Sequence, residues 1–77
     1  MRCVISSPTN TDTYATLRSV ILPTVRGTEQ VLSGHAEYIT RIDSGDVRLE
    51  AEDGTVEAVP VHNAICWVSA GEVRIIL

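Results

Sequence analysis

The chain has 77 residues, with six arginines, no lysine and ten acidic residues, which give a net charge of -4. The arginines are scattered and do not form the clustered basic surface that phosphate binding needs, so the composition argues against a nucleic-acid partner. With no phenylalanine and one tryptophan, the core has to come from valine, isoleucine, leucine and alanine, a mixture that favours β-strands.

A chain of this length forms one domain with a thin core, which we expect to span residues 1–77. Its longest apolar run is the five residues from Ala64 to Val68, far below the ~20 of a membrane-spanning helix. The first residues lack a signal-peptide pattern. We therefore expect a soluble chain without direct membrane insertion. Cys3 and Cys66 lie in apolar runs without a Cys-x-x-Cys spacing, which predicts buried, reduced thiols.

The first third of the chain alternates strand patterns with turn formers. Met1 to Ser7 predicts a short strand that ends at Pro8, and the polar residues Thr9 to Thr13 predict a loop. Tyr14 to Leu22 predicts the next strand. Pro23 ends it, because proline has no N–H to donate to a central ladder.

The middle of the chain contains three more strand patterns. Glu29 to Leu32 predicts a brief strand that leads into a loop at Ser33 to His35, and Glu37 to Ile42 predicts the strand after it. This strand is expected to stop at a turn formed by Asp43 to Gly45. From Asp46 to Glu52 the apolar and polar residues alternate strictly, as in a strand with one wet face.

The last third begins with Asp53-Gly54, a pair typical of a tight hairpin turn. The returning strand, Thr55 to Val61, needs a change of facing near Ala58, and Pro60 places it on an edge or at a bulge. Ala64 to Val68 is apolar on both faces, which predicts the most buried strand. Glu72 to Leu77 alternates and predicts the final strand.

No helical spacing persists for the ~11 residues of a typical helix. The sequence therefore predicts an all-β fold, a small β-sandwich or flattened barrel of about seven to ten short antiparallel strands. The acidic residues between Asp43 and Glu57 are expected on its solvated face.

Residues that would carry catalysis or bind a metal are sparse. The Gly-x-Ser-x-Gly motif of hydrolases is absent from the sequence. A cupin-like metal site would combine His35, Glu37 and His62, whose imidazole and carboxylate groups suit Zn, Fe or Mn. Such a site usually has a second histidine where Glu37 stands, and His62 lies beside Asn63 in an expected turn. We therefore expect no catalytic residue, no metal and no cofactor.

A family resemblance emerges when five segments are taken together. The segments are Ser19–Pro23, Gly27, Val31–Ala36, Ile39–Arg48 and Trp67–Leu77. In this order and spacing, residues from about 3 to 77 resemble the N-terminal β-sandwich of the epsilon subunit of F-type ATP synthases. Ser33 and Glu37 stand where that family has prolines on either side of its Gly-His-Ala loop.

The resemblance implies a non-catalytic subunit of the central stalk, or rotor. Such a subunit couples rotation of the c-ring to the catalytic head through contacts with the gamma subunit and the c-ring. It would lie on the cytoplasmic side as a peripheral membrane protein held by the complex. The residues that match the family's c-ring-facing positions are Glu29, Gln30, Ser33, Gly34, His35, Glu37 and Tyr38.

Many members of the family add a C-terminal helical hairpin that can inhibit ATP hydrolysis and in some cases binds ATP. The present sequence stops at Leu77, within the last strand pattern, so we expect coupling without inhibition by such an arm. Two alternatives stay open at this point. One is a standalone β-sandwich adaptor, and the less favoured one is the cupin-like metal-binding domain.

Overall fold

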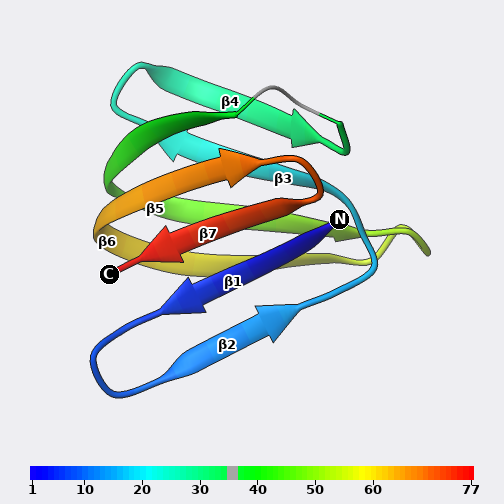
Figure 1. Cartoon of the computed structure of the whole chain (residues 1–77), viewed down its shortest axis with the longest axis horizontal. Helices are drawn as coiled ribbons and strands as arrows, with labels where there is room; N and C mark the ends of the chain where they lie inside the picture. Colours follow the sequence, from blue (N-terminus) through cyan, green and yellow to red (C-terminus); the bar gives the residue numbers. More distant parts are fainter. Residues whose placement is uncertain (35–36) are drawn as a thin grey trace.

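A computed structural model of the chain describes residues 1–34 and 37–77. These residues form seven β-strands and no helix (Figure 1), which confirms the predicted all-β fold. None of the described residues belongs to a helix long and apolar enough to cross a membrane. The strands are β1 (Arg2–Ser6), β2 (Thr11–Tyr14), β3 (Leu17–Thr24), β4 (Gly27–Leu32), β5 (Tyr38–Ala51), β6 (Val56–Ser69) and β7 (Glu72–Ile76).

The seven strands form one sheet in the order β2-β1-β7-β6-β5-β3-β4. Within the described residues β2 and β4 are its two edges, so the sheet is folded but not closed as a barrel. Five neighbouring pairs are antiparallel, and β1 and β7 are parallel. The prediction of antiparallel strands alone is therefore wrong for this pair. Its two strands come from opposite ends of the chain, so no short connection has to join them.

The polar segment after Pro8 is not wholly a loop. Thr11 to Tyr14 forms β2, which pairs with β1 and with no other strand of the described chain. An edge strand needs no apolar face of its own, and polar side chains protect it from pairing with other molecules. Because its residues are mostly polar, the sequence pattern did not predict β2 as a strand.

The strands β5 and β6 form a long hairpin that runs through both layers of the sandwich. They pair in one register from Tyr38 opposite Val68 to Glu50 opposite Val56. One half of the hairpin continues through β7 to β1 and β2, and the other half continues through β3 to β4 (Figure 1). The predicted turns at Asp43 to Gly45 and at His62-Asn63 are wrong, because both strands bend there and keep their pairing.

The bend changes which side chains face the core. In β5 the buried positions are Thr40 and Ile42 before the bend and Val47 and Leu49 after it. The matching switch in β6 occurs at Asn63, whose φ is 56°, and not near Ala58 as predicted. A single residue in this backbone conformation lets a strand change its facing without leaving the sheet.

Gly45 makes the bend sterically possible. Its φ is 151°, and a Cβ atom at this position would lie 2.9 Å from Cγ of Pro23 on β3. The predicted edge location of Pro60 is confirmed, since this part of β6 pairs with β5 and with no other strand of the described residues.

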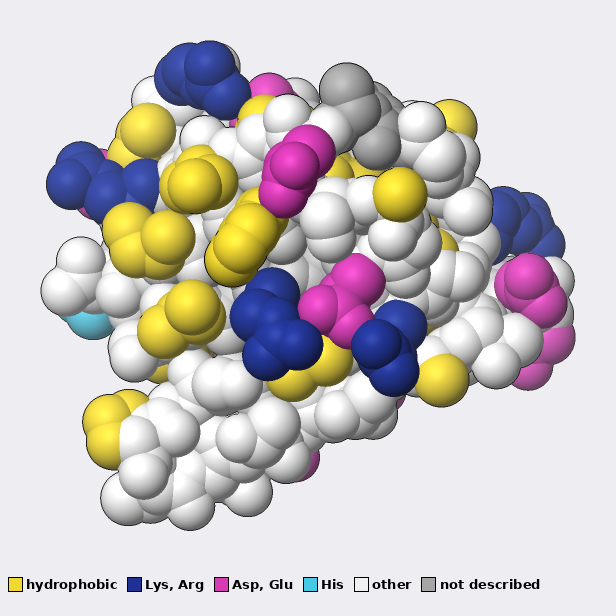
Figure 2. Space-filling model, in the orientation of Figure 1, with side chains coloured by type: hydrophobic (Ala, Val, Ile, Leu, Met, Phe, Trp, Pro, Cys, Tyr) yellow, Lys and Arg dark blue, Asp and Glu magenta, His cyan; other side chains and the backbone are white. Residues whose placement is uncertain are grey.

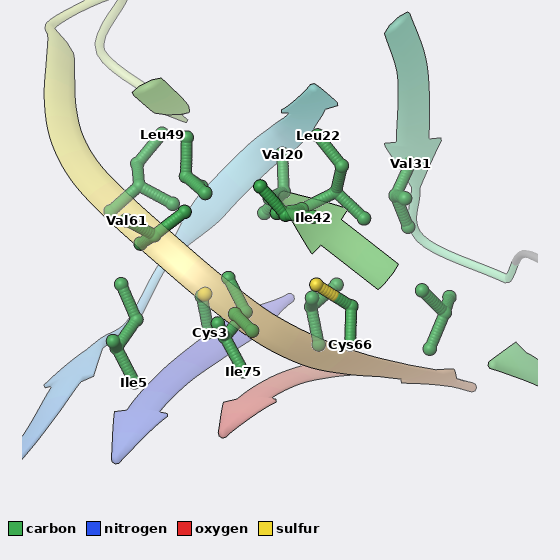
Figure 3. Packing of buried hydrophobic residues seen from close by; sticks show 14 of the residues in the cluster. Cys3, Ile5, Val20, Leu22, Val31, Ile42, Leu49, Val61, Cys66 and Ile75 are labelled. Atoms are coloured by element: carbon green, nitrogen blue, oxygen red, sulfur yellow. The ribbon is translucent and has the colours of Figure 1, made fainter. Parts of the chain in front are cut away.

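The core lies between the two layers (Figure 3). Side chains from both halves of the β5–β6 hairpin and from β1, β3, β4 and β7 meet there. The largest fully buried members are Val20, Leu22, Val31, Ile42, Val47, Leu49, Val68, Val73 and Ile75. The expectation that Ala64 to Val68 is buried on both faces is wrong. Its outward side chains, Ile65 and Trp67, are each 46% exposed.

Both cysteines are free and buried, as predicted. They lie on β1 and β6 with β7 between them, so two strand spacings of about 4.8 Å separate their backbones. That distance exceeds the ~7 Å limit for a disulfide. Burial raises the pKa of Cys3 to about 12 and that of Cys66 to about 11, which keeps both thiols protonated at neutral pH.

Candidate functional site

Four large apolar side chains face solvent on the outer side of β5, β6 and β7 in the half of the β5–β6 hairpin that pairs with β7. Ile39 lies opposite Trp67 across the β5–β6 pair, and Ile65 lies opposite Ile76 across the β6–β7 pair. Their exposed fractions are 65% for Ile39, 47% for Ile76 and 46% for both Ile65 and Trp67. We call these four residues the outer apolar face. A contiguous exposed apolar patch on a small domain marks a contact site for another molecule.

Charged side chains border this face (Figure 2). Arg41 lies opposite Ile65, and Arg74 lies opposite Trp67. Glu72 accepts hydrogen bonds from Arg2 Nε at 2.9 Å and from Arg74 Nη2 at 3.0 Å. These two bonds, the one from Arg2 first, lower the pKa of the Glu72 carboxyl. An apolar centre with a charged rim is the usual composition of a protein–protein interface.

The residues predicted to face the c-ring divide into two groups. Gln30 on β4, Ser33 and Gly34 after it, and Glu37 before β5 are exposed. Glu29 and Tyr38 are half-buried, and Tyr38 packs against the core. His35, the histidine of the predicted loop, lies outside the described residues. Ser33, Gly34 and Glu37 belong to the connection between β4 and β5, and Gln30 lies two residues before the end of β4.

Glu29 points toward the interior from the edge strand β4. Its Oε2 atom lies 3.7 Å from Arg26 Nη2, whereas its Oε1 atom is buried without a hydrogen-bond donor among the described residues. Burial, followed by the charge of Glu29, raises the pKa of Tyr38. The same carboxylate also raises the pKa of Cys66, after the larger effect of burial. The Glu29 carboxylate therefore raises the pKa of two groups that lie toward the core, the phenol of Tyr38 and the thiol of Cys66.

Glu37 connects the predicted loop with the outer apolar face. Its Oε2 atom accepts a hydrogen bond of 2.8 Å from the indole Nε1 of Trp67. Sequence reasoning assigned Trp67 to a strand buried on both faces and did not select it as a site residue. The available signal was size, because the inward residues Ala64, Cys66 and Val68 are small and alternate with the larger Ile65 and Trp67.

The alternative metal set does not assemble. Glu37 precedes Tyr38, which lies opposite Val68, whereas His62 lies six residues before Val68 on β6. Six residues of strand span about 20 Å, so Glu37 and His62 do not share a metal. Among the described residues, no group of three or more His, Cys, Asp or Glu side chains is arranged to hold a metal ion.

The family profile described as the β-sandwich domain of the ATP synthase delta/epsilon chain matches residues 1–77. The chain belongs to this family. The resemblance to the epsilon subunit is therefore confirmed, and it covers the whole sequence.

One relative and one solved structure are similar to this delta/epsilon-family chain. An ATP synthase epsilon chain of Endomicrobium trichonymphae is 49% identical over 41 residues, which are 53% of this chain and 30% of the relative. A cryo-EM structure titled as the central stalk and c-ring of the Tetrahymena thermophila mitochondrial ATP synthase contains a chain with the same fold. The TM-score is 0.77 at 8% identity, over 97% of this chain and 60% of that one. This chain spans less than two thirds of the length of either protein.

Proposed function

We propose that this delta/epsilon-family sandwich is the part of a central-stalk subunit that transmits rotation in an F-type ATP synthase. Family membership over residues 1–77 supports the proposal, together with the epsilon chain of Endomicrobium trichonymphae as a relative. The structure that shares the fold is titled as a central stalk with its c-ring. In this role the chain couples motions of its partners and catalyses no reaction itself.

The outer apolar face is the observation that carries the proposal, and its occupant is the gamma subunit. Ile39, Ile65, Trp67 and Ile76 have no structural reason to be apolar, since the core lies on the opposite side of their strands. Covering about half of each side chain would release water from apolar surface, which is the main driving force of association. Arg41 and Arg74 at the rim would orient the partner by charge and add less affinity.

The exposed end of the sandwich is the proposed c-ring contact. Gln30, Ser33, Gly34 and Glu37 are accessible there, and His35 belongs to the same predicted set. A contact made by small and polar side chains suits the polar loops of a rotating ring. Each exposed ion pair would contribute only about 0–1 kcal/mol. Through this contact the chain would be a peripheral membrane protein on the cytoplasmic side.

The test is the thermal midpoint of the isolated chain with increasing amounts of purified gamma subunit. A partner that binds only the folded chain stabilises it by mass action, so the midpoint should rise with gamma concentration. An unchanged midpoint at saturating gamma would contradict the proposal and favour a standalone adaptor. Sedimentation of the chain alone shows whether a second copy covers the outer apolar face, and we expect a monomer.

A second test addresses coupling in the assembled enzyme. The complex is reconstituted in vesicles with and without the chain, and ATP hydrolysis and proton pumping are measured together. We expect more protons pumped per ATP when the chain is present. Equal pumping per ATP in both preparations would contradict a role in transmission.

A further inference from the structure

We propose that Glu37 is a positioning residue that ties the loop end of the sandwich to the outer apolar face through Trp67. The inference deepens the proposed function and rests on it, because it makes the two contact regions parts of one coupled unit. Glu37 is the residue at which the chain enters β5. Trp67 belongs to the outer apolar face and is nearly half exposed.

The geometry supports this role. Ile39 lies opposite Trp67 on the outer side of the β5–β6 pair. Glu37 lies just before β5, two residues from Ile39, and its carboxylate reaches the indole of Trp67. The indole N–H is a donor only, and its 2.8 Å bond to the Glu37 carboxylate is charge-assisted. This bond favours the ring orientation in which the indole N–H meets the Glu37 carboxylate.

Glu37 is the carboxylate that accepts the bond from the indole. The other carboxylate beside Trp67 belongs to Glu72, which lines the same shallow depression together with Ser69 and Arg74. Both oxygens of Glu72 already accept bonds, Oε1 from Arg2 and Oε2 from Arg74. The Trp67 indole and the start of β5 therefore hold each other in place.

A reciprocal effect follows from this arrangement. A partner on the outer apolar face contacts the indole, and any preference for one ring orientation also favours one position of Glu37. By thermodynamic linkage, a partner that restrains Glu37 at the loop end changes affinity on the outer face by the same factor. The two contacts are thus coupled across one hydrogen bond without any change of fold.

The test uses amide and indole hydrogen exchange, measured by NMR on the whole chain. Trp67 is the sole tryptophan of the sequence, so its indole signal needs no assignment by mutation. In Glu37→Ala the indole N–H and the amides of Tyr38 and Ile39 should exchange roughly threefold faster or more, from the loss of one net hydrogen bond. Glu37→Gln keeps an acceptor oxygen and should restore slow exchange, which separates the bond from the charge.

A double-variant cycle completes the exchange test. Trp67→Phe keeps the aromatic ring and removes the donor, so it should loosen the same amides as Glu37→Ala does. The combined variant should loosen them no further, since both changes remove one interaction. The amide of Val47, beyond the bend, serves as the internal control and should not change. Unaltered exchange at Tyr38 and Ile39 in all variants would overturn the positioning role.

Affinity for the gamma subunit provides the second readout. Glu37→Ala should weaken binding roughly threefold or more, and Glu37→Gln should bind within about twofold of the original chain. Normal gamma binding by Glu37→Ala would overturn the coupling and leave the proposed function standing. If the original chain does not bind gamma, the proposed function fails, and the exchange data alone then decide the role of Glu37.

Discussion

In the half of the β5–β6 hairpin that pairs with β7, both faces of β5, β6 and β7 carry large apolar side chains, yet only those on the inner face are covered. Ile42, Cys66 and Ile75 on the inner face are 0% exposed, and they hold the two layers together. Their sequence neighbours on the outer face, such as Ile76 and Trp67, are about half exposed. Folding explains the first set and gives no reason for the second. The difference supports the proposal that a partner covers the outer apolar face.

The same hairpin supplies a second comparison on the other side of its bend. There the outward positions of β5 carry Asp46, Arg48 and Glu50, which is the usual polar outer face of a sheet that covers a core on one side. β5 therefore carries charged outward side chains on this side of the bend, whereas the β6 residues paired with them, Val56, Ala58 and Pro60, are apolar and exposed. The outer apolar face, and with it the proposed gamma contact, lies on the other side of the bend.

The largest expected effect separates the two faces on one strand. Ile75→Ala removes a fully buried side chain and should lower the free energy of unfolding by about 2–5 kcal/mol. Ile76→Ala, one residue later and 47% exposed, should change it by less than about 1 kcal/mol. Urea denaturation of both variants measures the difference. Equal losses would show that the two faces are not distinct.

The next effect concerns the bend that divides the hairpin. Gly45→Ala places a Cβ atom 2.9 Å from the Pro23 ring and should cost about 1–3 kcal/mol of stability through overpacking. Gly54→Ala is the matched control, because it has a positive φ of 93° and open space around the new atom. Thermal denaturation should show the larger loss for Gly45→Ala. The reverse order would contradict the packing described at the bend.

The two buried cysteines predict that the free energy of unfolding depends on pH. Burial raises the pKa of Cys3 from 9.0 to about 12 and that of Cys66 from 9.0 to about 11. A raised pKa in the folded state gives stability that is complete below the unfolded pKa and is lost as pH rises through the folded pKa. Between pH 8 and pH 10 the free energy of unfolding should fall by about 1 kcal/mol per thiol.

Urea denaturation across that pH range checks the loss, with Cys66→Ala as the control variant. Its pH slope above 9.0 should be roughly half that of the original chain, since one of the two thiols is gone. An unchanged slope would show that Cys66 does not contribute to the alkaline loss.

The smallest effect belongs to the charged rim. Glu72→Gln weakens the bonds from Arg2 and Arg74 and should cost at most about 1 kcal/mol, because exposed ion pairs contribute little. The lowered pKa of Glu72 means that this contribution is present at neutral pH and is lost as pH falls through the folded pKa. High salt should reduce the difference between the two proteins. A loss that does not respond to salt would contradict an electrostatic origin.

Periodicity predicted the all-β class, the Asp53-Gly54 hairpin and the strict alternation after Asp46, because these depend on neighbouring residues. It missed the bend, because Asp43 to Gly45 has the composition of a turn. In the structure β5 keeps its pairing with β6 through these residues, and Gly45 packs closely against Pro23 of β3. Neither contact is local in the sequence. The parallel β1–β7 pair joins the two ends of the chain and leaves no local signal.

The candidate site also has one part that could be predicted from the sequence and one part that could not. Family resemblance identified the polar loop residues, and their contact with a c-ring stays a prediction. Trp67 and Ile65 were assigned to the interior because both they and their neighbours are apolar. A sequence pattern records that a side chain is apolar and does not record whether its own chain covers it. That distinction needs the three-dimensional arrangement of β5, β6 and β7.

The most direct test of the outer apolar face is the affinity of two matched variants for the gamma subunit, measured by calorimetry. Ile65→Ser alters the outer apolar face, and Val56→Ser alters an exposed apolar residue on the other side of the bend. The two residues have similar exposed fractions, 46% and 53%. We predict at least about tenfold weaker binding for Ile65→Ser, as expected for a residue at the centre of an interface, and a change of less than about twofold for Val56→Ser. Equal affinities for the two variants, or the larger loss with Val56→Ser, would contradict the proposal that gamma binds the outer apolar face.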